Sequence, residues 1–339
     1  DPLWSRGLGD VYKRQTVYLG DRRYDLRLST VPNAQGERLV VRLLNQSRVF
    51  SLEKLGYAPA RAQALRRLTH LDSGLVLFVG PTGSGKTTAL YALIASLVSM
   101  QRSIATIEQP VEYVLPGLSQ VDVRPERGGT FASMLRAQLR QDPDVLLVGE
   151  IRDEETAEAA TRAALTGHLV FSTLHSSAAR YAVPRLLDLG ISAPVIGETL
   201  QAVVSQRLVR RLCPTCASPV TAPYSPAENL MHEITRERPR YRAVGCRECA
   251  FVGFKGVMPV AEFYFPTNQD RLSLMQGAPT PDIWNSETPV REEDGPDHRP
   301  LALRALDLVV SGVTTPEEAV RAMGQSWWSA LARHYKHVG

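Results

Sequence analysis

The residues from Gly80 to Thr87 (GPTGSGKT) have the types and spacing of a phosphate-binding loop, G-x-x-x-x-G-K-[ST]. Its glycines allow backbone N–H groups to turn around a phosphate, and the helix expected after them presents its positive N-terminus. Lys86 can reach the β- and γ-phosphates, and the Thr87 hydroxyl can bind Mg²⁺. The predicted nucleotide-binding residues are Gly80, Pro81, Thr82, Gly83, Ser84, Gly85, Lys86, Thr87 and Thr88.

A second acidic centre lies at Glu150, which follows the apolar run 145–148 (VLLV). In an α/β sheet the carboxyl ends of the parallel strands lie beside the nucleotide. Glu150 can therefore act as the base on an attacking water, directly or through Mg²⁺. The alternative interpretation is a surface glutamate that happens to follow a core strand.

All four cysteines of the chain fall into two C-x-x-C pairs, Cys213 with Cys216 and Cys246 with Cys249. Two such pairs can supply four thiolates in tetrahedral geometry, the closed arrangement of structural zinc. Disulfides or a redox-active pair are the alternatives, and neither suits a chain with so few cysteines in this spacing. The sequence therefore predicts a zinc site.

The elements that position these residues are predicted to be short buried strands alternating with helices. We expect strands at Leu75–Val79, Ser103–Ile107, Val145–Val148 and Leu169–Thr173, and helices at Thr87–Leu97, Phe131–Arg140 and Glu154–Thr166. This alternation implies a parallel sheet that is covered on both faces.

The flanking segments carry patterns of other kinds. Residues 16–45 alternate in the strand period and contain turn residues at 33–36, which predicts strands, and residues 58–71 indicate a basic helix. Residues 186–212 are expected to be largely helical. Residues 279–300 are polar and rich in proline, which indicates a loop or linker, and two helices are expected at Leu301–Val310 and Pro316–Met323.

Length and composition limit the classes of protein that fit. The 339 residues suggest two or three domains, and 44% hydrophobic with 22% charged residues is ordinary for a folded soluble protein. A net charge of +4 (39 − 35) does not mark a dedicated nucleic-acid binder. No apolar run approaches the roughly 18–20 residues of a membrane helix, and no signal peptide opens the chain. Any membrane role is therefore expected to be peripheral.

Taken together, ordered blocks between Tyr24 and Met323 resemble the ATPases of type II secretion and type IV pilus assembly. Besides the P-loop and the cysteines, these blocks are an acidic box at 106–112 (TIEQPVE), a Walker B ending at 149–153 (GEIRD) and a histidine box at 166–175 (TGHLVFSTLH). The resemblance implies an α/β fold: a RecA-like P-loop NTPase domain with a parallel sheet. Part of a mixed α+β N-terminal domain would precede it, and a small tetracysteine zinc insert would interrupt it.

The resemblance also implies domain boundaries and an N-terminally truncated chain. The expected units are 1–15 as a non-native or disordered segment, 16–57 as the remnant of a second N-terminal domain, 58–212 as the ATPase core, 213–250 as the zinc insert and 251–339 as a C-terminal helical region.

Further site residues are implied by the family pattern. Glu108 and Glu112 belong to the acidic box, with Glu108 a second catalytic carboxylate, whereas Gln109 replaces the family's aspartate. Four residues match phosphate sensors of the family: Arg27, Arg42, His168 and His175. The alternatives are solvated arginines on a strand and histidines hydrogen-bonded to the backbone.

The function implied is an ATP-hydrolysing motor, a homohexameric ring that powers assembly of a type II secretion pseudopilus or a type IV pilus. Its cofactors would be ATP, Mg²⁺ and Zn²⁺. Its partners would be an inner-membrane platform protein and a cytoplasmic-face docking protein, which places it in the cytoplasm, peripheral to the inner membrane. Two alternatives remain open: a nucleic-acid translocase, suggested by the basic residues at 58–71 and 207–211, and a weakly active nucleotide-binding regulatory subunit, suggested by Gln109.

Overall fold

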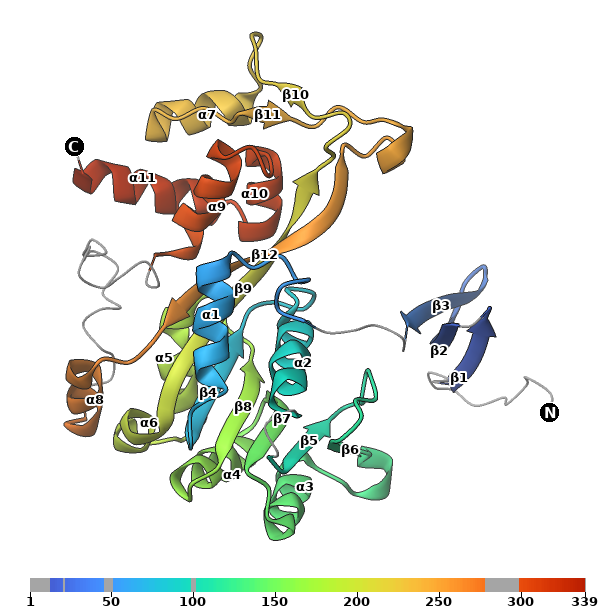
Figure 1. Cartoon of the computed structure of the whole chain (residues 1–339), viewed down its shortest axis with the longest axis vertical. Helices are drawn as coiled ribbons and strands as arrows, with labels where there is room; N and C mark the ends of the chain where they lie inside the picture. Colours follow the sequence, from blue (N-terminus) through green and yellow to red (C-terminus); the bar gives the residue numbers. More distant parts are fainter. Residues whose placement is uncertain (1–12, 21, 46–50, 99–101, 278–298, 339) are drawn as a thin grey trace.

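The centre of the protein is a seven-stranded sheet with the strand order β12-β9-β4-β8-β7-β5-β6 (Figure 1). The computed structural model describes residues 13–20, 22–45, 51–98, 102–277 and 299–338. All neighbouring strands in the sheet are parallel except β12, which is antiparallel to β9. Its strands are β4 (Gly74–Val79), β5 (Ile104–Glu108), β6 (Ser119–Asp122), β7 (Val145–Ile151), β8 (Leu169–Leu174), β9 (Leu200–Leu212) and β12 (Phe254–Tyr264).

Helices cover both faces of this sheet, which confirms the predicted fold class. The strand period of two sends Val76 and Phe78 of β4 into one apolar core with α1 (Pro59–Leu68) and α2 (Lys86–Leu97). The alternate residues of β4 pack in a second core on the other face. That core contains side chains of α3 (Phe131–Gln138), α4 (Glu154–Leu165), α5 (Ala182–Asp188) and α6 (Ala193–Thr199).

The prediction that residues 186–212 are largely helical is wrong for their second half. Helix α5 ends at Asp188 and helix α6 at Thr199, and the long strand β9 follows α6 directly. Its first half is buried between β4 and β12, where β-branched Val203 and Val204 fit the pleated sheet. Burial in the sheet therefore decides the secondary structure of this segment, because its polar residues at 205–207 obscure the strand pattern in the sequence.

The strands β9 and β12 continue past the sheet as a two-stranded ribbon that carries the tetracysteine unit, drawn yellow to orange in Figure 1. This unit contains β10 (Ser218–Pro219), α7 (Pro226–Thr235) and β11 (Tyr241–Arg242). Short 3-10 turns lie here and elsewhere, at Pro125–Arg127, Leu139–Gln141, Ala179–Tyr181 and Arg247–Cys249.

Three C-terminal helices, α9 (Leu301–Val310), α10 (Pro316–Met323) and α11 (Ser326–Val338), pack against the ribbon and α7. The first two confirm the predicted helices, and α11 lies in the C-terminal region that was expected to be helical, whereas the strand β12 at the start of that region was not predicted. The side chain of Glu318 is fully buried and joins α10 to β9, because its carboxylate accepts hydrogen bonds from the guanidinium and backbone N–H of Arg210 (both 2.8 Å). Helix α8 (Asn268–Met275) packs separately against α6.

The N-terminal strands form a separate three-stranded antiparallel sheet, β1 (Lys13–Leu19), β2 (Arg22–Asn33) and β3 (Gly36–Asn45). This confirms the strands predicted at 16–45. Residues 13–15, which we set aside with the first fifteen, pair with β2 and belong to the sheet. Residues 1–12 and nearly all of the predicted linker at 279–300 lie outside the described residues. Among the helices that the structure describes, none combines the length and apolar character needed to cross a bilayer.

Candidate nucleotide site and metal centre

The predicted P-loop lies between β4 and α2, at the carboxyl end of the sheet. Two of its glycines leave no room for a side chain: a Cβ on Gly80 would lie 2.6 Å from the backbone carbonyl oxygen of Gln206, and one on Gly85 would lie 2.7 Å from the side-chain nitrogen Nε2 of Gln206. Gly85 also caps α2 in the left-handed region, at φ +86°. The buried Ser84 hydroxyl has no hydrogen-bond partner among the described residues. The loop therefore contains a polar group without a partner in the described chain, which a bound phosphate could satisfy.

Lys86 is folded back into this loop. Its Nζ donates to the carbonyls of Gly80 (2.7 Å) and Pro81 (3.1 Å). Burial lowers the pKa of Lys86, the charge of Arg207 lowers it further, and the carboxylate of Glu150 opposes both. Thr87 is exposed in the first turn of α2, where its hydroxyl is available to a metal ion, and Thr88 is half-buried.

Glu150 and His175 lie at the same edge of the sheet as the P-loop. Glu150 is the second-to-last residue of β7, and its side chain is 13% exposed. Its carboxylate oxygens lie 2.6 Å from Arg152 Nη2 and 3.5 Å from His175 Nε2. His175 directly follows β8, the neighbour of both β7 and β4. The fold thus brings together Lys86, Glu150 and His175 from three adjacent strand ends.

His168 is not part of this group. It precedes β8, and a strand of six residues at about 3.3 Å per residue puts it about 20 Å from the P-loop edge. Its Nδ1 lies 3.0 Å from the carbonyl oxygen of Ala163 and 3.2 Å from the hydroxyl of Thr166. Within one chain, His168 therefore has the backbone contact of a structural histidine, and a phosphate-sensing role is proposed below for His175 alone.

The acidic box divides into two environments. Glu108, the last residue of β5, is buried and accepts hydrogen bonds from the hydroxyls of Tyr91 and Thr106 and from the amide of Gln120. Burial raises the pKa of Glu108 despite these donors. Gln109 is exposed. The oxygens of Glu108 are thus occupied by hydrogen bonds to α2, β5 and β6.

Glu112, at the end of the acidic box, contacts the N-terminal sheet instead. Arg27 of β2 donates from Nη1 to a Glu112 carboxylate oxygen (2.7 Å) and from Nη2 to the Val111 carbonyl (3.2 Å). Arg27 is 5% exposed, whereas Arg42, directly opposite it on β3, is exposed. The structure therefore places Arg27 on the acidic box, and among the described residues no hydrogen bond joins either arginine to the P-loop.

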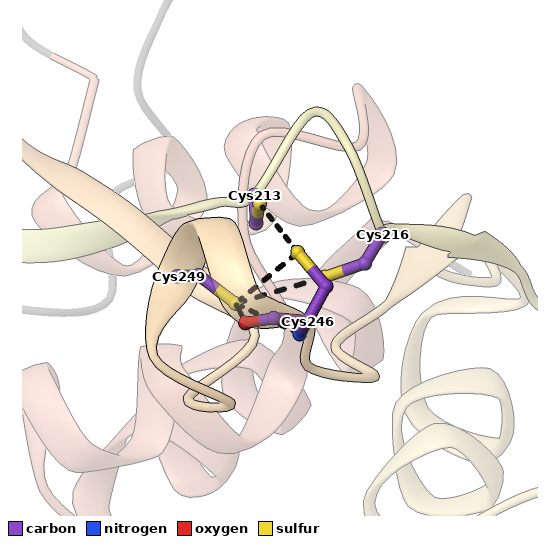
Figure 2. Close-up of side chains that lie close together, drawn as sticks. All are labelled: Cys213, Cys216, Cys246 and Cys249. Atoms are coloured by element: carbon purple, nitrogen blue, oxygen red, sulfur yellow. Dashed lines mark hydrogen bonds between the residues drawn. The ribbon is translucent and has the colours of Figure 1, made fainter.

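The four cysteines converge at one end of the ribbon, where Cys213 and Cys216 follow β9 and Cys246 and Cys249 precede β12, as Figure 2 shows. Three sulfur pairs are 3.8–3.9 Å apart: Cys213 with Cys246, Cys216 with Cys249, and Cys246 with Cys249. A disulfide needs about 2.05 Å, whereas a tetrahedral zinc with Zn–S bonds of about 2.3 Å separates its sulfurs by about 3.8 Å. The backbone N–H of Cys246 lowers the pKa of the Cys249 thiol to about 6. The donor set therefore fits a structural zinc ion.

The structure adds residues to which the sequence assigned no role in the site. Gln206, on β9, accepts a hydrogen bond from the Tyr57 hydroxyl and donates one from its amide to the Ser84 carbonyl (2.7 Å). Arg207 follows it. We missed both because residues 186–212 were expected to be helical, although a polar Gln-Arg pair inside an apolar segment was a visible signal.

Solved structures of similar fold include the pilus retraction motor PilT with bound ADP, at TM-score 0.64 and 26% identity, with 92% of this chain and 77% of that one aligned. The Legionella pneumophila ATPase DotB aligns at TM-score 0.65 and 21% identity over 92% of this chain and 76% of that one. The DotB likeness concerns the fold alone.

The chain is also similar in sequence to curated proteins. It is 41% identical over 313 residues to the type II secretion system protein E of Klebsiella pneumoniae, covering 92% of this chain and 61% of that protein. It is 40% identical over 319 residues to the type II secretion system ATPase E of Vibrio cholerae, covering 92% and 61%. The chain thus spans about three fifths of the length of these relatives. The family model described as "Type II/IV secretion system protein" matches residues 12–321, and the chain belongs to this family.

Proposed function

We propose that this chain binds Mg-ATP at residues 80–88 and hydrolyses it, as a motor subunit of a type II secretion or type IV pilus machine. The observation that carries the proposal is the convergence of Lys86, Glu150 and His175 on one edge of the sheet, beside a P-loop whose buried Ser84 hydroxyl has no partner in the part of the chain that the structure describes. Family membership and the similarity to a relative that is named a type II secretion system ATPase support the same reaction.

Each residue has a distinct part in the reaction. The P-loop amides hold the phosphates, and Lys86 exchanges the carbonyls of Gly80 and Pro81 for β- and γ-phosphate oxygens. Mg²⁺, held by Thr87, would neutralise charge on those oxygens. Glu150 accepts a proton from the attacking water while the oxygen of that water bonds to the γ-phosphorus. The bond between the γ-phosphorus and the β-γ bridging oxygen breaks, which releases ADP. His175, 3.5 Å from Glu150, responds to the γ-phosphate.

The motor part of the proposal extends from the chain to its assembly. Homohexameric rings would complete each site with arginines of the N-terminal sheet, Arg27 and Arg42, and hydrolysis would move this sheet relative to the ATPase core. The ring would act on an inner-membrane platform protein, and a docking protein would hold it at the cytoplasmic face of the inner membrane. The names of the relatives, which are type II secretion E proteins, support this setting.

A regulatory subunit that binds ATP without turning it over is the second candidate. The observation that favours it is the replacement of the family's aspartate by Gln109, together with a buried Glu108 whose oxygens are already hydrogen-bonded. The nucleic-acid translocase has less support, because two of its basic residues are engaged: Arg61 is buried over the ring of Phe263, and Arg210 is bonded to Glu318.

Steady-state hydrolysis of Mg-ATP tests the proposal, with Lys86→Ala as the blank and Gln109→Asp measured beside the parent. We expect hydrolysis above the blank in the parent, unchanged by added single- or double-stranded DNA. Hydrolysis in Gln109→Asp alone would identify the regulatory subunit. Stimulation by DNA that weakens with salt would identify the translocase.

A further inference from the structure

Arg207 of β9 lies across the start of the P-loop. In the sheet, β9 and β8 are the two neighbours of β4, on opposite sides. The guanidinium of Arg207 donates from Nη1 to the Gln206 carbonyl (2.9 Å) and from Nη2 to the Ser177 carbonyl (2.5 Å), in the loop that follows β8. Because the side chain starts on one neighbour of β4 and bonds a residue beyond the other, it crosses the carboxyl end of β4, where the P-loop begins.

Arg207 and Lys86 meet at the same residue of the loop. A Cβ on Gly80 would lie 3.1 Å from Arg207 Nη1, and the Gly80 carbonyl accepts a hydrogen bond from Lys86 Nζ (2.7 Å). The lysine of a P-loop reaches the β- and γ-phosphates. The guanidinium of Arg207 therefore lies at the end of the site that would hold the terminal phosphate. It does not lie at the end that would hold the nucleobase.

The charge of Arg207 is only partly balanced. Both hydrogen bonds that its guanidinium donates within the described residues go to backbone carbonyls and none to a carboxylate. Glu262 of β12 acts on it electrostatically, but a Glu262 oxygen is bonded to the backbone N–H of Leu301 (3.0 Å). Arg180 is a further cation close to Glu262. Two cations at one glycine repel each other, and an anion between them relieves that repulsion.

We propose that Arg207 binds the terminal phosphate of the nucleotide in the same chain, exchanging the Ser177 carbonyl for a phosphate oxygen. The inference rests on the proposed function and adds a residue to it. A planar guanidinium suits this part because its parallel N–H groups match a phosphate edge. Since Ser177 follows His175 by two residues, the exchange would also release the loop that carries His175 whenever a triphosphate is bound.

Calorimetric titration tests this, with Mg-ADP and with Mg-AMP-PNP, a triphosphate that is not hydrolysed. The proteins are the parent, Lys86→Ala, Arg207→Gln and, as a matched control, Arg211→Gln, which changes an exposed arginine on the same strand. We expect Arg207→Gln to weaken AMP-PNP binding by about tenfold or more, as for the loss of a hydrogen bond to a charged group. Its ADP affinity should change by less than about threefold, and Arg211→Gln should change neither.

An equal loss for both nucleotides would make Arg207 a structural support of the P-loop and overturn the inference, as would no loss for either. Failure of the parent to bind either nucleotide would instead overturn the proposed function, and the inference with it. If Arg207→Gln does not fold, Arg207→Lys keeps the charge without the planar fork. In that case Arg207→Lys must lose more affinity for AMP-PNP than for ADP.

Discussion

Two carboxylates at the ends of neighbouring strands differ in what surrounds them. Glu150 on β7 is partly exposed, and the cations Arg152 and Lys86 lie near its carboxylate. Glu108 on β5 is buried among three hydrogen-bond donors. The sequence predicted Glu150 as catalytic because it follows an apolar strand, whereas Glu108 was implied as a second catalytic carboxylate by the family's acidic box. Only their side-chain surroundings, which depend on Tyr91 and Gln120 from other elements, separate the two.

The raised pKa of Glu108 makes a prediction about stability. Because folded Glu108 binds its proton more tightly than the unfolded chain does, the stability of the parent should fall, relative to that of Glu108→Gln, as the pH rises above the ordinary glutamate pKa. Thermal unfolding of both proteins between about pH 5 and about pH 8 measures this difference. The exposed Glu126→Gln serves as control and should show no such trend. A difference that stays constant over this range would contradict the assignment.

At the scale of elements, the sequence predicted the helices and strands whose secondary structure is determined by the pattern of their own residues. Short apolar runs gave β4, β7 and β8, and helical periodicity with a capping Thr315 gave α10. The strand β9 was missed because its burial between β4 and β12 comes from pairing with residues far away in the chain. The P-loop and the cysteines were found because their spacing is local. Gln206 and Arg207 were not, because their relation to the P-loop exists only across strands.

The tetracysteine unit offers a test at this scale. Purified protein should contain about one zinc ion per chain, and removal by a chelator should loosen residues 212–250, since metal binding there contributes folding free energy. Hydrogen exchange should report the loss in this unit, while α2 and β4 keep their protection. The double variant Cys246→Ser, Cys249→Ser should show the same loss of protection in this unit. A protein with four free thiols and no zinc would contradict this site.

At the scale of the whole molecule, one sheet connects every site described. The P-loop, Glu150 and His175 lie at its carboxyl edge, and β9 runs without interruption from Gln206 beside the P-loop to Leu212, next to Cys213. At the other end of the order of strands, the N-terminal sheet reaches the acidic box through Arg27 and Glu112. Both outer units are thus connected to strands of the sheet that carries the P-loop, an arrangement that would suit the proposed motor.

The proposed role of Glu150 is tested by comparing the parent with Glu150→Gln in two measurements on the same preparations, affinity for Mg-AMP-PNP and steady-state turnover of Mg-ATP. We expect Glu150→Gln to bind nucleotide as the parent does and to lose most of its turnover, because the loop and Lys86 would hold the phosphates while Glu150 would take the proton of the attacking water. Turnover equal to that of the parent would contradict it and move the base to another residue, with Glu108 the first to examine.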